Sequence, residues 1–204
     1  MTVDPLASAI LDFWFVPDAG ERIADQAPTA PRERVTRDVW FRKDDVFDAR
    51  IRERFGVALA AGIAGAFGAW CDAPLGSLAR VVLLDQFTRN AFRGTPDAFA
   101  GDSGAFATAE DAIERGFDRA LAPQERWFLY MPFEHGESLA QQDRAVALFE
   151  ALAAETGFDD PLPWVLRHRD VIRRFGRFPH RNEILGRAST PEELAFLEQP
   201  GSRF

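Results

Sequence analysis

The chain of 204 residues has three histidines, and all of them lie among charged neighbours. His135 lies in the stretch MPFEHGES, between Glu134 and Glu137. His168 and His180 lie twelve residues apart, in a stretch from 168 to 187 that holds six arginines. An imidazole beside a carboxylate can transfer protons near neutral pH, and an arginine can bind an anion. These residue types therefore predict acid–base chemistry or the binding of an anionic small molecule.

A polar pair also interrupts an otherwise apolar helical stretch. Residues 80–87, RVVLLDQF, are apolar on nearly all sides apart from Asp85 and Gln86, which is typical of a buried helix. A buried carboxylate needs a partner, and Arg89, four residues later, stands in the favourable order for an acid and a base on one helix. We therefore expect Asp85 inside the fold, either in a structural clamp with Arg89 or at the floor of a ligand pocket.

The candidate residues come from three separate stretches that we expect to meet in one polar cluster. The candidate catalytic residues are carboxylates that could act as acid or base and histidines that could shuttle a proton: Asp85, Glu134, His135 and His180. The candidate ligand-binding residues, with arginines to anchor an anionic group, are Gln86, Arg89, Asn90, Arg93, Glu137, His168, Arg177, Arg181 and Asn182.

Each of these features also has a purely structural interpretation. His168 shares a helical stripe with Val165 and Ile172, so its ring could be a core side chain with a satisfied hydrogen bond. Glu137 stands near the start of a helix, where the helix dipole stabilises a carboxylate. The basic turn around Arg177 could be a solvated surface that balances an acidic protein.

The bulk composition excludes several classes of partner. A net charge of −8 and a pI near 5.0 argue against binding to nucleic acid or to an anionic membrane. No stretch approaches the ~18 apolar residues of a membrane span, and the N-terminal sequence lacks the basic region of a signal peptide. The single cysteine, Cys71, cannot form an internal disulfide. We expect a cytoplasmic protein whose partner is a small molecule or a peptide.

The elements that must hold the candidate residues are predicted to be helices throughout. Apolar residues recur at helical spacing along almost the whole chain, without strand-like alternation. Helix starts are indicated at Asp4, Asp44, Asp102 or Ser103, Pro123 and Thr190, and helix ends at Gly116, Pro132, Gly157 and Gly176. The sequence thus predicts one all-α domain over residues 1–204, an array of about seven to nine helices with a flexible loop at about 17–37.

Three long motifs resemble a known family. They are LLDQFTRNAFRGTPDAFAGD (83–102), ERWFLYMPFEHGESLAQQ (125–142) and HRDVIRRFGRFPHRNEILGRASTPEELAFL (168–197). They resemble the uncharacterised bacterial family DUF924, and the likeness extends over nearly the whole chain. The resemblance implies a tetratricopeptide-like, right-handed helical array, and it carries no established activity. All the candidate residues above stand at polar positions typical of the family, as do Gln142 and Arg174.

Three functions are compatible with these residues. The first is a pocket for an anionic small molecule, which could be catalytic through carboxylate and histidine chemistry. The second is a helical scaffold that binds a protein or peptide. The third is a metal site formed by the three histidines with Glu134 or Glu137. No phosphate-binding loop, dinucleotide fingerprint, HExxH motif or GxSxG motif occurs, so the sequence identifies neither an enzyme class nor a cofactor.

Overall fold

The computed structural model describes residues 3–17 and 37–203, and every regular element in these ranges is helical. Most of the flexible loop predicted at 17–37 lies outside the described residues. With Pro74–Ala91 counted as one continuous helix, the described residues form eight α-helices. The prediction of an all-α fold with seven to nine helices is confirmed. The tetratricopeptide-like, right-handed arrangement and the single domain stay predictions.

The helices vary in length from four to nineteen residues. The α-helices are α1 (Pro5–Phe15), α2 (Asp45–Ile63), α3 (Pro74–Val81), α4 (Thr88–Ala91), α5 (Asp102–Glu114), α6 (Pro123–Glu134), α7 (Leu139–Thr156), α8 (Leu162–Phe175) and α9 (Pro191–Leu197). A π-helical segment, Val82–Phe87, joins α3 to α4, and a short 3-10 turn, η6 (Pro179–Arg181), lies between α8 and α9. Within the described ranges, none of these helices has both the length and the apolar character needed to cross a membrane.

Several helices begin where their capping residues predict. The Asp4 carboxylate accepts hydrogen bonds from the first backbone N–H groups of α1, and the Asp44 carboxylate does the same for α2. Thr190 and Glu193 form the expected capping box of α9. The prediction of Asp102 or Ser103 as the cap of α5 is wrong. This helix begins one residue earlier, at the Gly101 cap, because the Asp102 side chain is bound to an arginine instead.

The predicted end of α6 at Pro132 is also wrong. The helix continues for two more residues, and the His135 N–H still donates to the Met131 carbonyl at 2.9 Å. Pro132 lacks the N–H that would bond to the carbonyl four residues earlier, but its fixed φ is helical and the last turn of α6 forms around it. The extra residues place Glu134 in the last turn of α6 and make His135 the capping residue.

Aromatic rings fill the main core between α1, α2, α6 and the π-helical segment. Trp14 is fully buried, with its ring 5.5 Å from that of Phe128 and 5.7 Å from that of Phe87. The ring of Phe13 lies 5.3 Å from that of Phe55. Such rings bury a large apolar area and add favourable edge contacts. They hold the π-helical segment and α6 in fixed positions, and these two elements carry the polar residues of interest.

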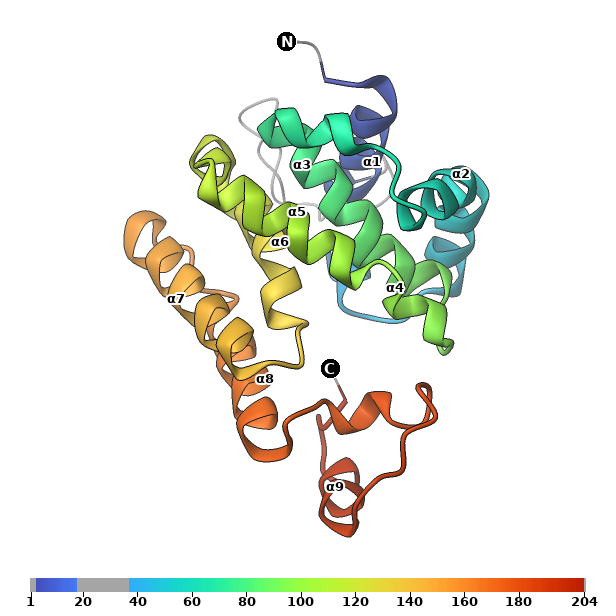
Figure 1. The fold of residues 1–204 in the computed structure, drawn as a ribbon, viewed down its shortest axis with the longest axis vertical. Coiled ribbons are helices and arrows are strands. Elements are labelled where there is room, and N and C mark those ends of the chain that lie inside the picture. The colour runs from blue at the N-terminus through green and yellow to red at the C-terminus, as the bar shows by residue number, and fades with distance from the viewer. Residues whose placement is uncertain (1–2, 18–36, 204) are drawn as a thin grey trace.

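The C-terminal part of the chain has a small apolar cluster of its own. Val171, Ile172 and Phe178 are buried in it, and Phe175 and Phe196 pack against them. Figure 1 shows this part, in orange and red, beyond the end of α6 and beside the lower end of α8. We call residues 176–203 the C-terminal segment. It reaches the main body through polar contacts to the turn after α6.

Candidate functional site

The π-helical segment positions the first polar group. All six of its residues are buried, and Asp85 has no exposed surface. A π-helical turn shifts the register of the side chains that follow it, and such turns are frequent at functional sites. The Thr88 hydroxyl donates to the Leu84 carbonyl at 2.7 Å, a bond that occurs where helices are locally distorted. The prediction that Asp85 lies inside the fold is confirmed.

A glycine lets α5 begin directly against this segment. At Gly101 a side-chain Cβ would overlap the backbone carbonyl of Leu84, so another residue type would push the two elements apart. This close approach brings Asp102 to Arg89, whose guanidinium donates to both Asp102 oxygens at 2.8 and 3.1 Å.

The Asp85 carboxylate has three polar partners. Its Oδ1 lies 2.8 Å from Nδ1 of His135 and 3.0 Å from Nη1 of Arg89. Its Oδ2 accepts a hydrogen bond from the Gln86 amide at 2.5 Å. Burial raises the pKa of Asp85, but Arg89 and His135 outweigh burial and lower this pKa to about 2. Asp85 is therefore an ionised carboxylate at neutral pH.

His135 is neutral at the same pH. Burial lowers the pKa of its imidazole, and the positive charge of Arg89 lowers it further, against the opposing effect of Asp85. An ionised carboxylate can only accept hydrogen bonds, so the Nδ1–H of His135 donates to Asp85. The second ring nitrogen, Nε2, then carries a lone pair, and its direction is set by Asp85. A carboxylate orients a histidine base in this way in hydrolytic triads.

A second carboxylate–imidazole pair lies next to the first. Nδ1 of His168 lies 2.9 Å from a Glu134 carboxylate oxygen and 2.9 Å from the Trp164 carbonyl. Both of these groups accept, so Nδ1 of His168 carries a hydrogen. The rings of His135 and His168 have centroids 6.4 Å apart. Glu134 and His135 are adjacent in sequence but serve different pairs, since one side chain faces α8 and the other faces the π-helical segment.

The C-terminal segment completes the cluster. The ring of Phe178 lies 5.5 Å from that of His168 and 5.6 Å from that of His180. Burial, followed by the positive charge of Arg181, lowers the pKa of His180 to about 3, so His180 is neutral at physiological pH. Nη1 of Arg181 donates to the main-chain carbonyl of His135 at 3.0 Å. The structure thus brings the three predicted stretches together.

Two candidate ligand-binding residues lie in a separate network. The Asn90 amide donates to Asp48 of α2 at 2.7 Å, and Arg93 donates to both oxygens of the same carboxylate at 2.8 and 3.1 Å. These bonds hold α4 against α2. Asp48 is a buried partner that sequence reasoning did not single out, because only the packing of the two helices brings it to Arg93.

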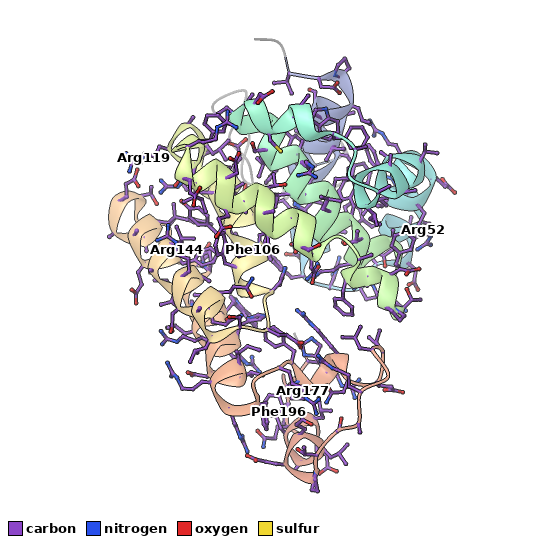
Figure 2. All side chains as sticks on the ribbon, viewed as in Figure 1. Arg52, Phe106, Arg119, Arg144, Arg177 and Phe196 are labelled. Atoms are coloured by element: carbon purple, nitrogen blue, oxygen red, sulfur yellow. The ribbon has the colours of Figure 1, made fainter. Side chains whose placement is uncertain are left out.

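Three further candidates belong to the network of the C-terminal segment: Arg177 and Asn182 bond within it, and Glu137 attaches it to the turn after α6. Arg177 donates to both oxygens of Glu193 at 2.6 and 2.8 Å, and the Asn182 amide lies 3.3 Å from the same carboxylate. Glu137 binds the Arg187 guanidinium at 2.6 and 2.9 Å. It also accepts a hydrogen bond from the backbone N–H of Phe178, the residue just before η6. Figure 2 labels Arg177, which lies with Phe196 on this segment.

Sequence reasoning missed some residues that shape the cluster. The sequence indicates Asp102 only as a helix cap, and nothing in it distinguishes Arg187 from the many other arginines. Phe99 and Phe178 contact the guanidinium of Arg181, with Cζ at 4.9 and 4.4 Å from their ring centroids. Asp102, Phe99 and Phe178 fall inside the motifs quoted above, but side-chain type alone gives no signal that a ring will cover a cation.

These features define an all-α protein built around a buried, charged carboxylate that orients an imidazole. Over residues 10–201 the sequence matches the family model described as bacterial protein of unknown function (DUF924), and the chain belongs to this family. The resemblance seen in the motifs is thereby confirmed.

One solved structure is similar over almost its full length. It is the structure of the protein of unknown function ATU0120 from Agrobacterium tumefaciens, which is 41% identical in sequence. The alignment covers 95% of this chain and 97% of that one, with a TM-score of 0.77. Among curated proteins, no sequence matches this chain.

Proposed function

We propose that this protein binds a small anionic molecule at the cluster of Asp85, His135 and Arg181, and that His135 acts on it as a general base. The observation that carries the proposal is the 2.8 Å contact between Nδ1 of His135 and the buried Asp85 carboxylate. This contact fixes the tautomer of the ring and directs Nε2 away from Asp85.

His135 and Asp85 differ in solvent exposure, and this difference gives them different roles. The Asp85 side chain is completely buried, whereas the His135 side chain retains 12% of its surface. Both Asp85 oxygens are already bonded to protein groups, so of this pair only the imidazole is left to meet a ligand. Asp85 orients the ring and stabilises the imidazolium that forms when Nε2 takes a proton. General base catalysis of this kind contributes roughly 10²–10⁴-fold in rate.

The other two hypotheses have less support. Within residues 3–17 and 37–203, no group of three or more histidine, cysteine, aspartate or glutamate side chains could hold a metal ion. No observation specifically favours a scaffold for a protein or peptide. We further propose that the protein acts in the cytoplasm, on the ground that its single cysteine, Cys71, is a free thiol.

A thermal-shift screen of anionic metabolites, followed by NMR of each stabilising compound with the protein, tests the proposal. We expect at least one compound that raises the Tm and is consumed. Asp85→Asn should keep its binding and lower its turnover by roughly 10²–10⁴-fold, since the ring is no longer held in the required tautomer. His135→Gln should abolish turnover.

Tyr130→Phe is the matched control, because it alters a buried polar network formed with Asp118 and Arg126 instead. It should bind and turn over the compound as the unmodified protein does. Full turnover by His135→Gln would contradict the proposal.

A further inference from the structure

Arg181 differs from the other arginines of the motifs in having no acidic partner. Arg89, Arg93, Arg177 and Arg187 each form an ion pair with a carboxylate at 3.0 Å or less. Arg181 is only 7% exposed, and within the described part of the chain no carboxylate oxygen lies within 4.0 Å of its guanidinium. Asp102, Glu137 and Asp85 act on Arg181 only from beyond this distance. A buried cation without a directly bonded carboxylate is costly, so this arrangement requires an explanation.

The hydrogen bonds of Arg181 leave one edge of the guanidinium unused. Nη1 donates to the His135 carbonyl, whereas Nε is buried without a hydrogen-bond partner. The rings of Phe99 and Phe178 lie within 4.9 Å of Cζ and restrict the guanidinium to a fixed position. The edge formed by Nε and Nη2 makes no hydrogen bond to the described residues. Two parallel N–H groups on such an edge match the two oxygens of a carboxylate.

The surrounding charges favour a ligand with a single negative charge. Arg89 is already balanced by Asp85 and Asp102, so the cluster does not offer a second unpaired guanidinium. Burial and the charge of Arg89 lower the pKa of Arg181 to about 10, so it remains a cation at neutral pH. A phosphate ester carries up to two negative charges and strong hydration, which fit a single cation between two phenyl rings less well than a carboxylate does.

We propose that Arg181 binds the carboxylate group of a small-molecule carboxylic acid, through two parallel hydrogen bonds from Nε and Nη2. Because Arg181 also contacts the main chain of His135, the carboxylate would hold the adjacent atoms of the ligand beside the imidazole. That second step rests on the proposed function of His135, whereas the binding of the carboxylate does not.

The test is a calorimetric and thermal-shift titration of the full chain. The probes are sodium acetate, propionate and benzoate, with sodium chloride at matched ionic strength and sodium phosphate as a separate arm. We expect a saturable rise in Tm with the carboxylates and none with chloride. In Arg181→Gln the Kd should rise at least about tenfold, since the loss of even one of the two charge-assisted hydrogen bonds costs about that much. Arg173→Gln, an exposed arginine of α8, is the matched control and should bind as the unmodified protein does.

Each outcome decides the inference. No response to carboxylates, a stronger response to phosphate, or unchanged binding in Arg181→Gln would overturn it. Arg181→Lys covers the case in which the glutamine variant does not fold. Lysine keeps the positive charge but lacks the two parallel N–H groups of the guanidinium. Carboxylate binding in Arg181→Lys as tight as in the unmodified protein would therefore also overturn the inference. Carboxylate binding that survives His135→Ala and depends on Arg181 would support it, even if no reaction at His135 were found.

Discussion

Replacing Arg89 by methionine would leave Asp85 buried without its permanent positive partner. The guanidinium bonds the Asp85 carboxylate at 3.0 Å, the Asp85 main-chain carbonyl at 2.7 Å and Asp102 at 2.8 Å. Methionine fills a similar volume but supplies none of these contacts. The change therefore isolates the electrostatic role of Arg89 with little loss of packing.

The expected loss of stability is large. Breaking one partner out of a buried ion pair costs about 3–5 kcal/mol, because the remaining charge is left uncompensated. For a protein of this size each kcal/mol corresponds to roughly 2–4 °C in Tm, so the Tm should fall by about 6–20 °C. Removing one partner of an exposed ion pair destabilises a protein far less. Arg173→Met, which removes an exposed pair with Asp170, should change stability by less than about 1 kcal/mol.

The effect of pH provides an independent check of the cause. In the unmodified protein Asp85 has a pKa of about 2, below its ordinary 3.8. Its ionised form therefore contributes roughly 2 kcal/mol, present above pH 4 and lost as the pH falls toward 2. In Arg89→Met the sign reverses, because burial then dominates and raises the pKa of Asp85. The ionised carboxylate destabilises this variant at pH 7, and protonation at lower pH removes the penalty.

Urea unfolding followed by tryptophan fluorescence at pH 7 and pH 5 measures both effects, since the chain has five tryptophans. The difference in unfolding free energy between the unmodified protein and Arg89→Met should be smaller at pH 5. A loss below about 1 kcal/mol at pH 7, or an equal loss at both pH values, would refute the reasoning. Adding Asp85→Asn to Arg89→Met should recover part of the stability, because it removes the unpaired charge.

Three further predictions concern contacts that stabilise the fold near the cluster and away from it. Gly101→Ala should destabilise the protein by roughly 1–3 kcal/mol or more, measured as a lower urea midpoint, because its Cβ would overlap the Leu84 carbonyl; an unchanged midpoint would contradict the close approach. Glu137→Gln should cost about 1–2 kcal/mol by weakening the bond to Arg187. Since burial is outweighed by Arg187 and the pKa of Glu137 is lowered below 4.5, this difference should be present above pH 4.5 and should shrink on acidification. Tyr130→Phe should lower the unfolding free energy by about 1–3 kcal/mol, because the buried carboxylate that accepts its hydroxyl at 2.7 Å loses a donor.

Local rules were sufficient to predict the helices and the burial of the key residues. Capping side chains at Asp4, Asp44 and Thr190 act within one helical turn, so the sequence alone indicates these helix starts. The apolar surroundings of Asp85 and the stripe that contains His168 likewise predicted that both side chains are buried. These predictions depend only on residues a few positions apart.

The partners across the fold could not be obtained in this way. The spacing of residues 78–92 suits a regular helix and does not indicate the π-helical segment, which packs against α2, α5 and α6 in the fold. Arg89 binds Asp102, and Arg93 binds Asp48, because helix packing brings together residues that are far apart in the sequence. Pro132 is a local signal that was overridden, since its missing hydrogen bond falls in the last turn of α6.

The separation of the two apolar clusters has a consequence for local opening of the native state. His180 and Arg181 are attached to the small cluster around Phe178, whereas Asp85 belongs to a helix held by the main core. Partial detachment of residues 176–203 would therefore dismantle the cluster while the rest of the molecule stays folded. Hydrogen exchange should report this as early amide labelling in that segment, and a bound carboxylate should slow labelling there more than elsewhere.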